Sequence, residues 1–301
     1  MLKTKLKKKS KKIDKELLFC IAMLAIPLVQ FTIFYVIVNF NSFLMAFQKA
    51  TFNYGEVTYS FTGFDNFKEL WRDLTETNVL RSALKNSLIT WFFTSLLGIS
   101  IAVIFSYYIF KKGWGGSFFR LILFLPSILP AILLAAIFQS FVDNVLPELF
   151  DINQLFVLGE GTAFPMALVF SLWFGFGMQV LLYNGTMEQI SPSVLEAAQL
   201  DGVTPIIELW KIVIPEILPA VATFLIAGIA TIFTNQAGVY GFHGPAALDY
   251  EGEYTLGYWM YTKVQGGESN YTYASTVGLC CTMIALPLTL LVKRLLIRKE
   301  G

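Results

Sequence analysis

The chain has 301 residues, of which 55% are hydrophobic and only 14% are charged, and its formal net charge is +1. A soluble domain of this size could not bury so much apolar surface, so the composition indicates a membrane protein with several spans. The three cysteines lie in apolar runs and the single histidine has no Cys/His cluster near it, which argues against a disulfide framework and a zinc site.

The N-terminal part combines a lysine block with a long apolar run. Residues 1–16 hold eight lysines and stand directly before the apolar residues 17–40. Such a block could be a nucleic-acid-binding tail, but next to a span it is more typical of a positive-inside anchor. The run can cross a hydrocarbon core of about 30 Å. It is too long for the apolar part of a signal peptide, and no small-residue cleavage site follows it. We therefore expect a permanent first span.

Five further apolar runs are long enough to cross a membrane. They lie at about 86–110, 121–142, 164–183, 217–236 and 273–292. Before the first of these, a mixed polar and aromatic stretch carries a turn signal at 53–55, and residues 66–74 have the pattern of a short helix at the membrane surface. Pro126 and Pro130 should break or kink the third span, which helix bundles tolerate.

The distribution of charge predicts the orientation of the six spans. Both lysine-rich ends, the turn between Lys111 and Arg120, and the segment 185–216 fall on one side, which the positive-inside rule assigns to the cytoplasm. The acidic stretch 143–163 and the polar stretch 241–271 then become outside loops. The segment 185–216 dissents, because its acidic residues outnumber its single lysine. This excess of acid favours contact with another protein.

The segment between the fourth and fifth spans begins with strong helix signals. Ser191 and Pro192 form a favourable helix start, since proline at the first helical position loses no hydrogen bond. Ser193 and Glu196 stand in capping-box spacing. This first short helix should stop at Gly202, because glycine adopts the left-handed conformation past a helix end without steric cost.

A second helix is expected directly after the glycine turn. Thr204 is suited to the N-cap and Pro205 to the first helical position, and the helix should end around Ile214-Pro215. Two helices joined by a glycine turn between two membrane spans form a rigid element that another protein could grip. The alternative is an ordinary interhelical loop with a glycine turn.

This segment also contains a recurring pattern of residues. It consists of Glu196, Ala197, Ala198, Asp201 and Gly202, followed by Ile214-Pro215 and Leu218-Pro219. The pattern resembles the EAA loop of the inner-membrane permease subunits of ABC importers, in the carbohydrate-uptake branch. The resemblance implies an all-α membrane protein with six transmembrane helices, the type I ABC-importer permease fold. It would consist of a permease domain, 17–296, between cytoplasmic tails at 1–16 and 297–301, with the EAA loop at 185–216.

The same resemblance implies partners and a location. The five residues from Glu196 to Gly202 would couple this chain to an ATPase dimer, whose cleft receives the helix of Glu196. A second permease subunit and an extracellular solute-binding protein would complete the importer, in a bacterial cytoplasmic membrane with both termini inside. ATP and Mg would bind to the partner ATPase, so no cofactor is expected in this chain.

The chemistry that is missing agrees with a transporter driven by a partner. The six spans, as bounded above, contain no Asp, Glu, Lys, Arg or His, whereas ion-coupled carriers need such a group inside the membrane. The chain also lacks a Walker A sequence, so it binds no nucleotide itself. We expect a transporter membrane subunit and not an enzyme.

Uncharged polar residues near the fourth and fifth spans are the candidates for a substrate path. They are Ser171, Trp173, Gln179, Asn235, Gln236 and Tyr240. Amides bond hydroxyl groups and flat rings stack on sugar faces, but such residues also serve helix–helix contacts or interfacial belts. Asn235 is the first choice, because in the permeases that the chain resembles a polar residue at this distance after the EAA motif faces the path.

The expected function is import of a sugar or oligosaccharide by alternating access. The first alternative keeps the importer and changes the cargo to a peptide, a phosphodiester or another solute. Spans without charge favour a neutral cargo. A membrane-bound enzyme or a scaffold is the remote alternative, because the acidic residues of 143–163 have no metal-binding spacing.

Overall fold

The computed structural model describes residues 15–53, 56–151 and 157–297. Within these ranges, six helices are long and apolar enough to cross a membrane. They are Phe19–Met45, Val79–Phe110, Ala131–Phe150, Ala163–Met187, Pro205–Ala230 and Glu268–Leu296. The predicted number of spans is confirmed, whereas several boundaries differ. Most of the two predicted tails, 1–16 and 297–301, lies outside the described residues.

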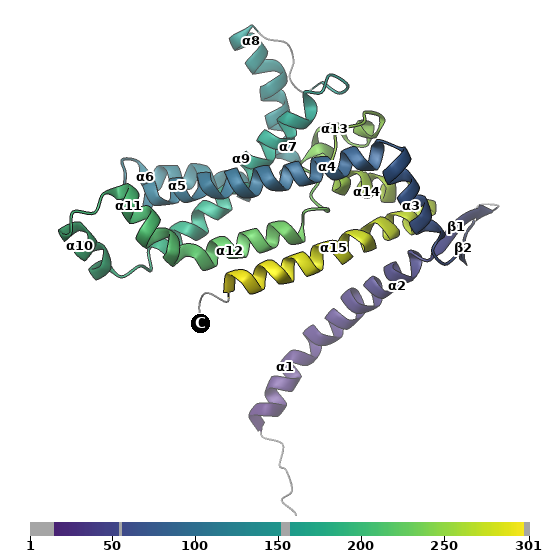
Figure 1. The fold of residues 1–301 in the computed structure, drawn as a ribbon, viewed down its shortest axis with the longest axis horizontal. Helices are drawn as coiled ribbons and strands as arrows, with labels where there is room; N and C mark the ends of the chain where they lie inside the picture. The colour runs from purple at the N-terminus through teal and green to yellow at the C-terminus, as the bar shows by residue number, and fades with distance from the viewer. Residues whose placement is uncertain (1–14, 54–55, 152–156, 298–301) are drawn as a thin grey trace, which may run out of the picture.

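The first span stands apart from the other helices. It consists of α1 (Lys15–Phe31), the π-helical turn η1 (Thr32–Ile37) and α2 (Val38–Met45). Only its C-terminal end meets the bundle, and α1 points away from it (Figure 1). Its side chains are exposed from Phe19 to Leu44. Exposed apolar side chains over such a length require lipid or another protein around them.

A hairpin and a short helix follow the first span. Strands β1 (Gln48–Asn53) and β2 (Glu56–Phe61) pair antiparallel, and α3 (Asp65–Glu76) confirms the helix expected at 66–74. Asn66 is buried in the structure: its Nδ2 donates to the carbonyl oxygens of Ala46 at 3.1 Å and Gln48 at 2.7 Å. These bonds hold α3 against the corner at which the first span ends.

The bundle itself is built from four long helical segments. They are α4–η2–α5 (Val79–Phe92, Phe93–Leu97, Gly98–Phe110), α9 (Ala163–Met187), α12 (Ile214–Ala230) and α15 (Tyr271–Ile297). The predicted fourth span, 164–183, lies within α9. Helix α6 (Gly116–Ile128) crosses α9 closely, because a Cβ at Gly177 would overlap the carbonyl oxygen of Leu123. Helices α5, α9 and α12 share one hydrophobic core cluster, and a second cluster lies towards α14 (Leu256–Gln265) and α15.

The predicted bounds of the third span, 121–142, are wrong, whereas the break expected at a proline is confirmed at Pro130. Helix α6 ends before Leu129, which is extended with ψ 147°, and a second helical segment begins after Pro130. It consists of α7 (Ala131–Ser140), η3 (Phe141–Val145) and α8 (Leu146–Phe150), and it rises away from the bundle (Figure 1). Proline disfavours the helical conformation in the residue before it, which explains the break. Residues 143–150 are therefore helical, although a loop was expected there.

The predicted helix end at Ile214-Pro215 is also wrong. Helix α11 (Pro205–Glu208) continues through the π-helical turn η4 (Leu209–Val213) into α12 without a break. A proline inside an α-helix clashes with the carbonyl one turn earlier. The wider turn of η4 lies directly before Pro215, and it makes room for the ring. The fifth span is thus one helix from Pro205 to Ala230.

The fifth span ends earlier than expected, and the chain after it is folded. The Thr231 hydroxyl donates a hydrogen bond to the Ala227 carbonyl at 3.0 Å. The chain then turns, and the helix does not continue to residue 236. The stretch 241–271, expected as a polar loop, contains α14 (Leu256–Gln265), besides the short helices α13 (Val239–His243), η5 (Ala246–Asp249) and η6 (Glu268–Asn270). Helix α14 is buried over most of its first two turns.

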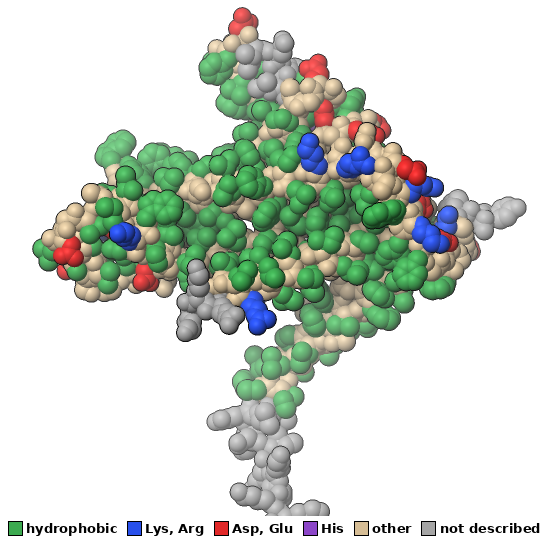
Figure 2. Space-filling view, in the orientation of Figure 1, with side chains coloured by type: hydrophobic (Ala, Val, Ile, Leu, Met, Phe, Trp, Pro, Cys, Tyr) green, Lys and Arg blue, Asp and Glu red, His purple; other side chains and the backbone are tan. Residues whose placement is uncertain are grey.

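The surface agrees with a membrane-spanning bundle. Figure 2 shows hydrophobic side chains over the middle of the molecule. The charged side chains gather mainly at the end that carries α10 (Pro192–Leu200) and at the end that carries α3. Large exposed apolar residues such as Leu96, Ile104 and Ile132 have the lipid-facing character that this arrangement requires.

Candidate functional site

Helix α10 (Pro192–Leu200) is the first helix of the segment 185–216, and it begins where the sequence predicts. Ser191 occupies the N-cap and Pro192 the first helical position. The capping box does not form, because the Ser193 hydroxyl lies 2.8 Å from the Ser191 hydroxyl and no side chain caps the helix. The carboxylate of Glu196 is thus not engaged in a cap, and its side chain is exposed.

Helix α10 ends at the predicted glycine. Gly202 is left-handed with φ 72°. Its N–H donates to the carbonyl of Gln199 at 3.1 Å, and the N–H of Val203 donates to the carbonyl of Ala198 at 3.0 Å. This pair of bonds is the Schellman motif, in which the glycine reverses the chain while the last helix carbonyls stay satisfied.

The predicted coupling residues lie together on this projecting helix and turn. Helix α10 extends beyond the ends of α9 and α12 (Figure 1), and among the described elements it has no extensive packing partner. Glu196, Ala197, Asp201 and Gly202 are exposed. Ala198 is only 6% exposed, so it packs inward, and Ala197 alone of the small pair offers a close approach from outside.

Large apolar side chains on the same element were missed by the sequence reasoning. Leu200 is 90% exposed, Ile206 71% and Trp210 66%. Exposed apolar groups of this size mark a contact with another protein or with lipid, and Ile206 and Trp210 belong to the fifth span. The signal was in the sequence, since these residues alternate with the charged ones, but only the folded turn shows that they point outward.

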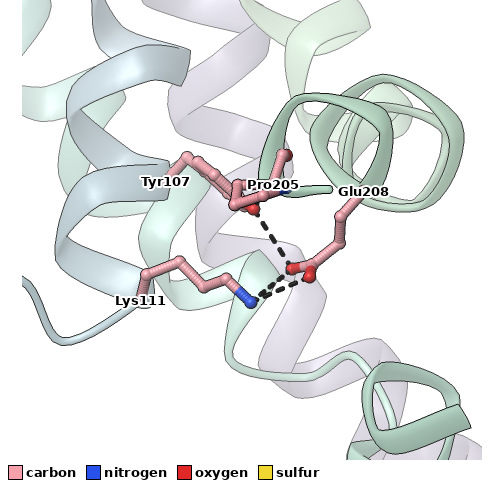
Figure 3. Close-up of polar contacts among 4 residues, drawn as sticks. All are labelled: Tyr107, Lys111, Pro205 and Glu208. Carbon is pink, nitrogen blue, oxygen red and sulfur yellow. Dashed lines mark hydrogen bonds and ion pairs between the residues drawn. The ribbon is translucent and has the colours of Figure 1, made fainter. Parts of the chain in front are cut away.

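The base of the second helix is held to the second span by a polar cluster (Figure 3). Lys111 Nζ lies 2.7 Å from Oε1 and 2.9 Å from Oε2 of Glu208. The hydroxyl of Tyr107 donates to Oε1 of Glu208 at 3.2 Å and is 3.0 Å from the carbonyl oxygen of Pro205. Glu208 is buried, whereas the side chain of Lys111 is partly exposed.

Asn235 lies in the turn after the C-terminal end of α12 and not in the fifth span. Its side-chain Oδ1 accepts a hydrogen bond from the N–H of Ala237 at 2.9 Å, and its carbonyl accepts one from the Thr255 hydroxyl at 2.7 Å. The side chain itself is exposed. Asn235 therefore shapes the turn that leads to α14.

Gln236 lines an open groove of about 760 Å³ between α2, the end of α12, α14 and α15. Its polar lining includes Asn39, Ser42, Thr234, Tyr261, Tyr271 and Ser275. None of the described residues that line the groove is charged. Amides, hydroxyls and tyrosine rings together can bond and stack on a sugar without offering it a charge.

The structure does not bring all six predicted path residues together. Tyr240 lies next to the groove, with its ring nearly perpendicular to that of Tyr261 and the two ring centroids 4.8 Å apart. The three residues on α9 do not line the groove. Trp173 stacks on Phe138 at 6.0 Å, Ser171 is half-buried, and the buried Oε1 of Gln179 has no hydrogen-bond partner among the described residues.

Comparisons with known proteins agree with this architecture. The chain is 28% identical over 184 residues to the maltose/maltodextrin transport system permease protein MalF of Vibrio cholerae, covering 58% of this chain and 34% of that protein. It thus spans about a third of the length of this relative. It is 26% identical over 279 residues to a probable ABC transporter permease protein of Mycoplasma pneumoniae, covering 87% and 80% of the two chains.

Solved structures and a family model add to these relatives. A bacterial ABC transporter involved in the import of the acidic polysaccharide alginate has a TM-score of 0.75 at 22% identity, over 96% of this chain and 98% of that one. The same kind of transporter in complex with an alginate pentasaccharide-bound periplasmic protein matches with a TM-score of 0.75 at 21% identity, over 98% of each chain. The model of the binding-protein-dependent transport system inner membrane component covers residues 80–297. The chain therefore belongs to the family of binding-protein-dependent transport system inner membrane components.

Proposed function

We propose that this chain is the permease subunit of an ATP-driven, binding-protein-dependent importer, and that it forms half of the translocation path for a neutral sugar or oligosaccharide. The observation that carries the proposal is the projecting α10, joined through the turn at Gly202 to one unbroken helix from Pro205 to Ala230. A partner that moves α10 thereby moves a rod that reaches the outer end of the bundle.

The proposed mechanism follows from this connection. A separate ATPase dimer, which holds ATP and Mg, would receive α10 in its cleft. Closure of the dimer would shift α10 and tilt α11–α12, and the bond from Thr255 to the Asn235 carbonyl would pass the movement to α14. The groove beside Gln236 would then open to one side of the membrane at a time. The chain itself would act as a transporter subunit without catalysis.

The cargo is proposed from the lining of the groove. A charged cargo needs a compensating charge or a set of aimed dipoles in a poorly solvated path. The described lining is mostly apolar, and its polar groups are amides, hydroxyls and two tyrosines, Tyr261 and Tyr271, without a charge. This composition supports a neutral sugar over a phosphodiester or a peptide with charged ends. The names of the relatives, maltose permeases and an alginate importer, support a saccharide.

The proposed setting is a bacterial cytoplasmic membrane, with α10 and both termini in the cytoplasm and 143–163 and 241–271 outside. Lysines at both ends of the chain and at Lys111-Lys112 support this orientation. A second permease subunit would cover the exposed apolar surface of the first span. An extracellular solute-binding protein would deliver the sugar, as in the solved complex of the alginate importer.

The test is uptake of a labelled panel of neutral and acidic saccharides by cells that lack this gene. The cells receive the wild-type gene, Glu196→Lys on α10, or the control Glu160→Lys, which reverses an exposed charge outside the segment 185–216. We expect one neutral saccharide to depend on the gene, and Glu196→Lys alone to abolish both its uptake and co-purification of the ATPase. Normal entry of every saccharide without the gene would overturn the sugar assignment. Co-purification of the ATPase with Glu196→Lys at the wild-type level would overturn the docking role of α10.

A further inference from the structure

Glu208 has a buried carboxylate, and the proposed function assigns no role to it. It is 2% exposed, although it belongs to the segment that would meet the ATPase. A buried charge is unfavourable unless it is paired and hydrogen-bonded. Both of its oxygens are within bonding distance of Lys111 Nζ, and Tyr107 donates a further bond (Figure 3). The carboxylate is therefore fully engaged with groups from one other helix.

The pair also suits the two helix ends that it joins. Lys111 is the C-cap of α5, where the helix dipole favours a positive charge, and Glu208 lies in the first turn of α11, where it favours a negative charge. The single hydroxyl proton of Tyr107 is shared between Glu208 and the Pro205 carbonyl of the same turn. The three contacts fix the base of α11 against the end of α5, both in position and in orientation.

This attachment adds a polar link to the apolar contacts of the segment, in which Val213 belongs to the core cluster of α5, α9 and α12 and Leu195 packs against it. Helix α10 has no extensive packing partner among the described elements, and α11 packs mainly along its own continuation into η4. A force applied to α10 can pass into α12 through the continuous helix. The apolar core cluster that α5, α9 and α12 share gives it one route to α5, and the contacts of Glu208 add a direct polar link at the start of the same helix.

We propose that Glu208, Lys111 and Tyr107 are positioning residues that hold the start of α11, in the segment 185–216, against the end of the second span. Movement of α10 then shifts α5 together with α12. The proposal rests on the proposed function of α10. If these contacts are absent, we expect ATP hydrolysis to continue while α5 follows the movement of α12 less closely, so that less cargo moves per ATP.

The test uses the complete importer, with both permease subunits, the ATPase and the binding protein, reconstituted in vesicles. Uptake of the saccharide and ATP hydrolysis are measured on the same preparation of wild type, Glu208→Gln and Tyr107→Phe. Glu188→Gln is the matched control, because Glu188 belongs to the same segment and pairs with Arg120 at 3.5 Å at an exposed place. Tyr107→Phe removes one hydroxyl and keeps the ring, so it tests these contacts if Glu208→Gln fails to accumulate.

We expect the amount of saccharide moved per ATP to fall about tenfold in Glu208→Gln and about threefold in Tyr107→Phe, with the ATPase still bound and no change in Glu188→Gln. The double reversal Glu208→Lys with Lys111→Glu should recover part of the ratio. An unchanged ratio in both single variants overturns the proposal, and so does a loss of uptake and hydrolysis in equal proportion. A wild-type complex that binds no ATPase overturns the proposed function instead.

Discussion

The two segments that flank α12 are built in opposite ways. On one side, the turn around Gly202 and α10 are exposed and lie beyond the packed bundle. On the other side, the start of α14 is buried and tied to α4: Asn86 Nδ2 donates to the carbonyls of Gly252 at 2.7 Å and Tyr254 at 3.0 Å. The projecting segment leaves its side chains open to a partner, as we propose for α10, whereas the buried segment is fixed by the spans around it.

A glycine in each segment shows the same contrast. Gly202 needs its left-handed φ of 72°, and a Cβ there would meet nothing within 4 Å. Gly257 has no such backbone requirement, but a Cβ there would lie 2.5 Å from the Thr234 carbonyl group. One glycine is required by the backbone of a free turn, and the other by the close approach of two packed segments.

The sharpest way to break this comparison is Gly257→Ala. The added methyl group would push α14 away from the Thr234 carbonyl, and such overpacking should lower the free energy of unfolding by about 3 kcal/mol. Thermal unfolding of the purified chain in detergent measures the loss. Gly278→Ala in α15 is the control, since no atom lies within 4 Å of its Cβ position. Equal stability of the two variants would contradict the close packing.

Asn86→Ala tests the hydrogen bonds that tie the chain directly before α14 to α4. It would leave the buried carbonyls of Gly252 and Tyr254 without this donor, which should lower the free energy of unfolding by about 2 kcal/mol. Ser100→Ala, at an exposed position that bonds only to the Leu96 carbonyl, should change it by less than about 0.5 kcal/mol. A denaturation series in one detergent compares both, and a matching loss in the control would argue against the special role of Asn86.

Gly202→Ala addresses the exposed segment. A non-glycine residue in the left-handed region costs about 1–2 kcal/mol, so a modest loss of stability is expected although no atom is displaced. Gly185→Ala provides the opposite sign: this glycine lies inside α9 with open space around it, and alanine there should stabilise the helix by about 0.5–1 kcal/mol. The same melting experiment reads both, and stabilisation by Gly202→Ala would refute the backbone argument.

The smallest expected effect is the pH dependence of stability that His243, in the stretch 241–271, contributes. Burial lowers the pKa of His243 from 6.5, against the opposing attraction of the Glu253 and Asp143 carboxylates. The unfolded chain then binds more protons than the folded one below pH 6.5, so stability should fall as the pH drops from 6.5 towards the lowered pKa. His243→Gln should flatten this part of a melting-temperature profile. A profile that is as steep in the variant would assign the effect to other groups.

The sequence by itself determined the features that depend on short windows of residues. Mean apolarity over about 20 residues is enough to count membrane spans. The Schellman turn at Gly202 and the start of α10 at Ser191-Pro192 follow from the conformational limits of those residues. For the same reason, the predicted coupling residues do lie on one helix and its turn.

The tertiary structure alone decided which polar groups are buried and where helices continue. Nothing near Glu208 in the sequence indicates that its partner is Lys111, on a different span. Pro215 signals a helix end locally, but the π-helical turn before it lets the helix run on. Aromatic residues of 241–271 are buried because α4 and α15 supply the surface against which they pack. Their side chains alone do not indicate this burial. Burial is a property of the whole packed bundle, so a window of sequence cannot determine it.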